Sequence, residues 1–155
     1  MNLKGAHMDK KKFKEVIQFA IDKEIEAFNF YTQGSQVVKY SGAKELFLEL
    51  AKQEEGHRKL LENLNIEKIA QVRVEKIPDL KISDYMVDAE FRPDLSYAEM
   101  LRTAMKREER SIKLYEDLKG ANPDEDLKKL FTFLVQEESK HKLRLEKIYD
   151  EEILK

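Results

Sequence analysis

The sequence predicts an all-α fold, a bundle of four helices arranged as two helical hairpins. Apolar residues recur at alternating spacings of three and four along four long segments, which places them on one face of a helix. Glycine and proline are scarce, with 5 and 3 positions in 155 residues, and this suits long uninterrupted helices. Matching residues also recur between the two halves of the chain, which indicates an internal pseudo-two-fold repeat.

Each hairpin is predicted to contain two helices. Taken in order, the four helices span about 10–38, 42–64, 96–119 and 123–152. In the first hairpin, Gly34 and Gly42 bracket the end of one helix and the start of the next. In the first two helices a glutamate, Glu24 or Glu54, interrupts the apolar stripe instead of lying on the charged face.

The second hairpin carries the signals of helix ends. Ser96 and Glu99 form a capping-box pattern before the third helix. Gly120 suits the end of that helix. Asn122 followed by Pro123 predicts an N-cap and a first-turn proline for the fourth helix.

Residues 65–95 are predicted to form a long crossover between the hairpins. This stretch holds two of the three prolines and is too long for an ordinary loop in a small domain. We expect it to run the length of the bundle, with a short helix near Leu80–Met86. Residues 1–155 then form a single domain with half-repeats at about 10–64 and 96–152.

Composition excludes several classes of function. The 29 basic and 31 acidic residues nearly cancel, so no strong field attracts nucleic acid or an anionic membrane. The absence of cysteine rules out disulfides, iron–sulfur clusters and thiolate zinc sites. The N-terminus has no apolar run as long as that of a signal peptide, and no apolar run in the chain is long enough to span a membrane. The expected location is therefore the cytoplasm.

Two matching sets of residues carry the chemistry. Every member of the second set lies 84 positions after its counterpart (108 − 24, for example). The first set is Glu24, Tyr31, Glu54 and His57, and the second is Glu108, Tyr115, Glu138 and His141. In a glutamate-rich helical protein, a single Glu-x-x-His motif usually lies on the solvated surface and binds no metal. Two in register with two core glutamates are the ligand set for two metal ions between four helices.

The spacing suggests a role for each residue. Glu24 and Glu108 are predicted to be terminal ligands, one for each metal, whereas Glu54 and Glu138 are predicted to bridge the pair. His57 and His141 share a helix face with the bridging glutamates three residues before them. Carboxylate and imidazole ligands suit iron, with manganese or a mixed-metal pair as alternatives. His7, ahead of a second methionine near the N-terminus, is not counted as a ligand.

Tyr31 and Tyr115 lie two helical turns after the terminal glutamates on the same face. We expect each phenol to donate a hydrogen bond to a metal-bound carboxylate of the other half, which would orient that ligand.

These motifs resemble the rubrerythrin-like branch of the ferritin-like di-iron carboxylate proteins. The matching stretches are EIEAFNFY (24–31), EEGH (54–57), EERSIKLY (108–115) and ESKH (138–141). The resemblance covers nearly the whole chain and implies a ferritin-like bundle with up-down-down-up helices around a di-iron centre. It also implies that the reduced centre reacts with hydrogen peroxide or dioxygen.

The chain departs from that family in two ways. Rubrerythrins proper carry a rubredoxin-like domain with four cysteines, and this chain has none, so an external donor is expected to supply electrons. Rubrerythrins also carry an additional glutamate one turn after the third-helix ligand, where this chain has Ser111. A symmetric site of four glutamates and two histidines is therefore expected.

Three functions compete on this basis. The first is a rubrerythrin-like oxidoreductase that reduces peroxide or reacts with dioxygen, supplied by a rubredoxin-like protein or a reductase. The second is iron handling, as a ferroxidase or a storage protein, and the third is a metal-binding sensor without turnover. The long crossover would permit helix exchange between protomers, so a homodimer, domain-swapped in one arrangement, is expected.

Overall fold

The computed structural model describes residues 10–39, 41–64, 92, 94–121 and 124–154. Within them lie four α-helices and no strand. The helices are α1 (Lys10–Val37), α2 (Ser41–Asn63), α4 (Tyr97–Ala121) and α5 (Glu125–Glu152). Each observed boundary lies within two residues of its predicted position, so the all-α four-helix prediction is confirmed.

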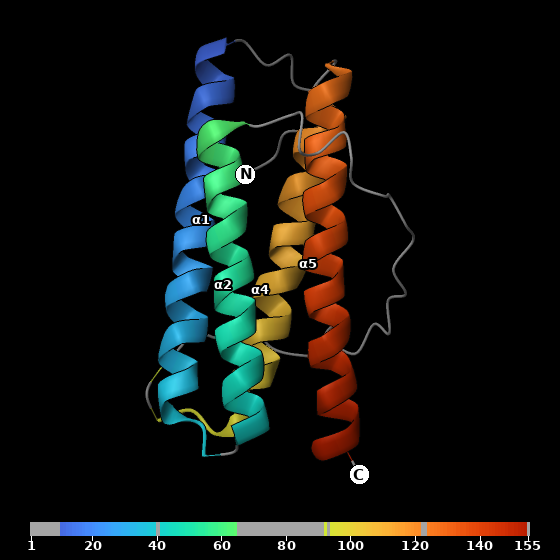
Figure 1. The fold of residues 1–155 in the computed structure, drawn as a ribbon. Coiled ribbons are helices and arrows are strands. Elements are labelled where there is room, and N and C mark those ends of the chain that lie inside the picture. The colour runs from blue at the N-terminus through green and yellow to red at the C-terminus, as the bar shows by residue number, and fades with distance from the viewer. Residues whose placement is uncertain (1–9, 40, 65–91, 93, 122–123, 155) are drawn as a thin grey trace.

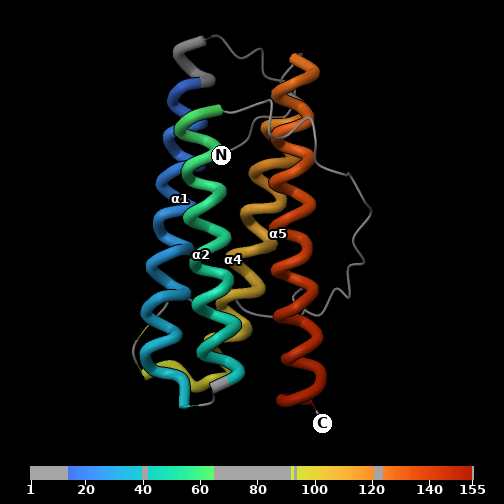
Figure 2. Tube along the Cα trace, viewed as in Figure 1, coloured from blue at the N-terminus to red at the C-terminus, as the bar shows by residue number. Residues whose placement is uncertain are grey.

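The helices run in the up-down-down-up order that the family resemblance implied. In Figures 1 and 2, α1 and α5 run in one direction, and α2 and α4 run in the other. The main packing is between α1 and α2 and between α4 and α5, which are the two predicted hairpins. The predicted crossover and its short helix near Leu80–Met86 lie outside the described residues, except for Arg92, Asp94 and Leu95.

One helix cap follows the prediction and one does not. The Ser96 N–H donates to Glu99 Oε1 (3.2 Å) and the Glu99 N–H donates to Ser96 Oγ (3.1 Å), which confirms the capping box of α4. At the start of α5 the N-cap is Asp124, whose carboxylate accepts from the N–H groups of Asp126 and Leu127. The prediction of an Asn122 N-cap was wrong because Asp124, two residues later, supplies an equally good acceptor. Asn122 and Pro123 themselves lie outside the described residues.

Gly34 lies in the last turns of α1, which continues to Val37 as predicted to within one residue. A Cβ atom at Gly34 would lie 3.1 Å from Cδ2 of Phe47, which is a tighter contact than side chains normally make. The glycine therefore allows α1 to pack closely against the Phe47 ring of α2.

The apolar core is divided into two clusters. The buried residues of one cluster are Phe30, Tyr31, Leu46, Phe47, Leu50, Ala51, Leu95, Met100, Leu101, Ala104, Met105, Leu145 and Tyr149. Those of the other are Val16, Ile17, Ala20, Ile21, Leu61, Tyr115, Leu118, Leu130, Phe131 and Leu134. On every helix a short stretch separates the two clusters, and it contains the predicted ligands. Among the described helices, none combines the length and apolar character needed to cross a membrane.

We expect Asp124→Ala to lower the free energy of unfolding by about 1 kcal/mol, because two N–H groups at the start of α5 lose their acceptor. Thermal and urea denaturation followed by circular dichroism would measure the loss. Asp124→Asn is the matched control and should retain most of the stability, since its side-chain oxygen can still accept. Equal losses in both variants would show that the cap is not the source of the effect.

Candidate metal centre

A layer of ionisable side chains lies between the two apolar clusters. It consists of the predicted ligands Glu24, Glu54, His57, Glu108, Glu138 and His141, which are all between 0 and 4 % exposed. Each helix contributes at least one of them. On every helix these ligands lie between residues of one apolar cluster and residues of the other. The structure thus brings together all six residues that the sequence singled out.

The six residues form two groups that share two carboxylates. Glu24, Glu54, His57 and Glu138 each offer one ligand atom, and the four atoms lie within 4.8 Å of one another. Glu54, Glu108, Glu138 and His141 form the second such group. Glu54 and Glu138, the predicted bridging residues, belong to both.

The shared carboxylates lie between the two imidazoles. Oε1 of Glu54 is 3.2 Å from Nδ1 of His57 and 3.2 Å from Nδ1 of His141. Oε1 of Glu138 is 3.0 and 3.4 Å from the same two nitrogens. The imidazole rings are stacked at 15° with their centroids 5.7 Å apart. This arrangement places ligand atoms around two adjacent positions that could each hold a metal ion.

The other two carboxylates, those of Glu24 and Glu108, each belong to one donor group only. Each accepts a hydrogen bond from a tyrosine of the opposite hairpin. Oε2 of Glu24 is 3.7 Å from Nδ1 of His57, and Oε1 of Glu108 is 3.5 Å from Nδ1 of His141. The Tyr115 hydroxyl donates to Oε1 of Glu24 and the Tyr31 hydroxyl donates to Oε1 of Glu108, both at 2.5 Å. These are the two cross-bundle hydrogen bonds expected from the sequence, and each leaves a second carboxylate oxygen available.

The donor set fits a pair of metal ions. Seven buried atoms of these six residues have no hydrogen-bond partner among the described residues. They are Oε2 of Glu24, Oε1 of Glu54, Nδ1 of His57, Oε2 of Glu108, both oxygens of Glu138 and Nδ1 of His141. Buried polar atoms are rarely left without a partner in folded proteins. All seven face one another across the polar layer, where two divalent ions would coordinate them and balance four carboxylates.

The pKa shifts show that, without metal, the buried carboxylates of the layer repel one another. Burial, and then the charges of Glu24 and Glu108, raise the pKa of Glu54 to about 8. Burial and the charges of Glu108 and Glu54 raise the pKa of Glu138 well above its usual range. Burial lowers the pKa of His57, but the adjacent carboxylates of Glu138, Glu24 and Glu54 outweigh it and the net shift is upward. Crowded carboxylates of this kind favour bound protons or bound cations.

Comparisons with known proteins agree with this geometry. The model of the rubrerythrin family matches residues 15–149. The chain belongs to the rubrerythrin family. A similar solved structure, presented as a ferritin-like diiron-carboxylate protein from Thermotoga maritima, is 26 % identical with a TM-score of 0.68, and the match covers 94 % of this chain and 97 % of that one. A hypothetical protein from Pyrococcus furiosus is also 26 % identical with a TM-score of 0.68, over 89 % of this chain and 88 % of its own. A search of curated proteins finds no significant match.

Sequence reasoning missed one residue of this rubrerythrin-family site. Oε1 of Gln53 on α2 accepts a hydrogen bond from Nε2 of His141 on α5. Because an amide oxygen only accepts, Nε2 carries the proton and Nδ1 presents its lone pair to the site. The counterpart of Gln53 at the 84-residue offset is Glu137, which pairs instead with Lys140 at 3.4 Å. The sequence offered only the position of Gln53 next to Glu54, which does not reveal a contact between helices.

The glutamates that adjoin the site in sequence turn away from it. Each forms an ion pair with a basic residue three positions away on its own helix. The pairs are Glu26 with Lys23, Glu55 with Arg58, Glu109 with Lys106 and Glu137 with Lys140.

We expect the metal-free protein to lose stability as the pH rises from about 4.5 to about 8. The pKa of Glu54 is raised from 4.5 to about 8, so between these values the folded state binds a proton that the unfolded chain does not. Stability therefore falls across this window, and the raised pKa of His57 acts in the same direction above pH 6.5. Melting temperatures at several pH values, with and without a divalent metal, would test this. Glu54→Gln should flatten the metal-free profile, and a metal-free melting temperature that rises with pH would contradict the prediction.

We expect Gln53→Leu to weaken metal binding at the His141 position about 10- to 100-fold, because the imidazole loses the group that fixes its tautomer and orientation. Titration with a divalent metal should then resolve one tight and one weak site. Gln53→Glu keeps an acceptor and should retain two tight sites. Equal weakening at both positions would mean that Gln53 acts through general packing.

Proposed function

We propose that this chain is a rubrerythrin-like di-iron oxidoreductase that reduces hydrogen peroxide, or reacts with dioxygen, using electrons from an external donor. The observation that carries the proposal is the pair of donor groups that share Glu54 and Glu138. Two shared carboxylates would hold two ions side by side, as two-electron reduction of one small oxidant requires. Carboxylate and imidazole donors suit iron, and manganese or a mixed pair is the alternative.

In this proposal the six residues have three roles. Glu24 and Glu108 would each hold one ion, and a tyrosine hydroxyl donates to one oxygen of each of these carboxylates. Glu54 and Glu138, which belong to both donor groups, would hold both ions. His57 and His141 bind through Nδ1, since these nitrogens face the shared carboxylates.

Two bound ferrous ions would supply the two electrons that, with two protons, convert one peroxide into two waters. The protein contributes orientation and proton control. Burial, followed by the charge of Glu108, raises the pKa of Tyr31 well above its usual range, and burial with the charge of Glu24 does the same for Tyr115. Both phenols therefore stay protonated and keep donating to the terminal carboxylates. Positioned O–H donors of this kind orient ligands, and they lie near enough to the centre to assist proton transfer.

The proposal includes a rubredoxin-like protein or a reductase as electron donor, and a homodimer as the working assembly. Storage of iron, the main alternative, requires a large hollow shell. A sizing column distinguishes the two, because a dimer cannot enclose an iron core.

Rapid mixing of the anaerobic ferrous protein with peroxide tests the function directly. We expect two iron ions per chain and an oxidation rate at least about 100-fold above that of ferrous iron in buffer, with formation of a bridged ferric absorption band. Glu54→Ala and Glu138→Ala should bind fewer than two ions and lose the fast phase. Glu55→Gln, which alters an outward-facing neighbour, is the matched control and should react as the unaltered protein does.

Oxidation no faster than that of iron in buffer would exclude the peroxide reaction. Tight binding of two ions without fast oxidation by peroxide or dioxygen would favour the sensor function instead.

A further inference from the structure

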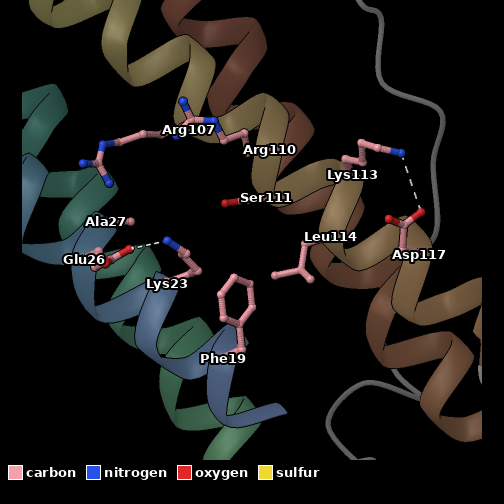
Figure 3. Close-up of a pocket in the computed structure, with 10 residues that line it drawn as sticks. All are labelled: Phe19, Lys23, Glu26, Ala27, Arg107, Arg110, Ser111, Lys113, Leu114 and Asp117. Carbon is pink, nitrogen blue, oxygen red and sulfur yellow. Dashed lines mark ion pairs between the residues drawn. The ribbon is translucent and has the colours of Figure 1, made fainter. Parts of the chain in front are cut away.

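A pocket of about 350 Å³ lies between α1 and α4, within the range of about 300–1,000 Å³ that is typical of small-molecule sites. Figure 3 shows side chains of both helices around it. A water molecule takes up about 30 Å³ of the liquid, and hydrogen peroxide, with two oxygen atoms, needs roughly twice that space. The pocket is therefore much larger than the small oxidant of the proposed function requires.

The pocket adjoins the metal centre. Ala27, which lines it on α1, lies one helical turn after the predicted ligand Glu24. Ser111, which lines it on α4, lies one turn after the predicted ligand Glu108. Residues three positions apart are neighbours on a helix surface. The pocket thus reaches the centre beside its terminal carboxylates, whereas both imidazoles come from α2 and α5.

Small residues keep this approach open. Ala27 and Ser111 are counterparts at the 84-residue offset, so the same position is small on both helices. Neither side chain is long enough to fill the space between α1 and α4 at this level. The two halves of the internal repeat therefore leave room for a ligand next to the metals.

One end of the pocket is apolar. In Figure 3, Phe19 and Leu114 lie at this end, Arg107 and Arg110 lie at the other, and the Ser111 hydroxyl lies between them. Phe19 is half-buried and belongs to neither apolar cluster of the described core. Leu114 is partly buried against one of the clusters. Both side chains can therefore cover the hydrocarbon part of a ligand.

The charges of the lining favour an uncharged ligand. Four cationic and two acidic residues line the pocket, and the cations are engaged with neighbours. Three of these contacts are those of Lys23 with Glu26 (3.0 Å), Lys113 with Asp117 (3.8 Å) and Arg107 with the centre of the Phe30 ring (4.9 Å). Arg110 has an interaction partner as well. An anion would have to compete with these contacts, whereas a neutral ligand would leave them intact.

We propose that this pocket binds an organic hydroperoxide, ROOH, with its apolar body over Phe19 and Leu114 and its peroxide group between Ala27 and Ser111, next to the metal centre. This substrate class rests on the proposed function, because the same two ferrous ions supply the electrons. The O–O bond of the hydroperoxide would break, and two electrons with two protons would give the alcohol ROH and one water. The two ions become ferric, and the external donor returns the electrons.

Zinc-loaded protein allows binding to be measured without reaction, because zinc has no redox chemistry. The probe is 2-phenyl-2-propanol, the alcohol that reduction of cumene hydroperoxide yields. Calorimetric titration should show one site per chain with a dissociation constant below about 1 mM. The absence of binding at millimolar concentration would overturn the proposal.

Two variants locate the site and a third is the control. Ser111→Leu fills the space beside Glu108 and Phe19→Ala removes the apolar cover, so each should weaken binding of the probe at least about tenfold. Ser139→Leu makes the same change as the first variant at a half-buried position of α5 outside the pocket lining, and should bind the probe normally. Circular dichroism and metal content confirm that the fold and the centre of each variant are intact. Undiminished binding in both pocket variants would refute the assignment.

Reaction with cumene hydroperoxide separates this substrate class from the proposed function. We expect it to oxidise the anaerobic ferrous protein at least about 100-fold faster than ferrous iron in buffer. In Ser111→Leu and Phe19→Ala, the rate with cumene hydroperoxide relative to that with hydrogen peroxide should fall at least about tenfold. Fast oxidation by hydrogen peroxide alone would leave the proposed function standing and exclude the organic substrate. Slow oxidation by both would exclude both.

Discussion

The burial of four carboxylates and two imidazoles at one level of the bundle is the constraint on which the rest of the structure depends. Isolated charges of this kind cost several kcal/mol each to remove from water, and here they are at most 4 % exposed. The cost falls only if protons or cations occupy the layer, which is why the pKa of Glu54 rises to about 8 in the bare protein. Two divalent cations would balance the four carboxylates. Metal binding would therefore stabilise the bundle.

The apolar clusters on either side hold this layer in place. Tyr31 belongs to one cluster and Tyr115 to the other, and each reaches across the bundle to a carboxylate of the opposite hairpin. These two hydrogen bonds tie the hairpins together at the level of the site. They also make each terminal glutamate depend on a residue from the other half of the chain. The pseudo-two-fold symmetry is incomplete, however, because Gln53 supports His141 whereas its counterpart Glu137 faces outward.

The sequence was sufficient to predict the helices and the convergence of the six buried residues, because both follow from periodicity along single helices and from one constant offset. Ends of helices were less predictable: Asp124 and Asn122 are both good N-caps, and only the path of the chain selects between them. The packing role of Gly34 could not be predicted because it depends on a close contact with Phe47 on another helix. Gln53 and the α1–α4 pocket escaped prediction for the same reason, since both depend on how side chains of different helices face each other.

Ser111 connects the metal centre with the pocket. Rubrerythrins carry a glutamate at the equivalent place, one turn after the third-helix ligand. Here the smaller, neutral side chain lines the pocket beside Arg107 and Arg110. A glutamate would occupy part of that space and would lower the net charge of the lining from two to one. The same replacement therefore leaves the centre with four glutamates and leaves open space between α1 and α4 beside it. Since both consequences follow from one position, the departure from the family pattern changes the ligand set and the space next to it together.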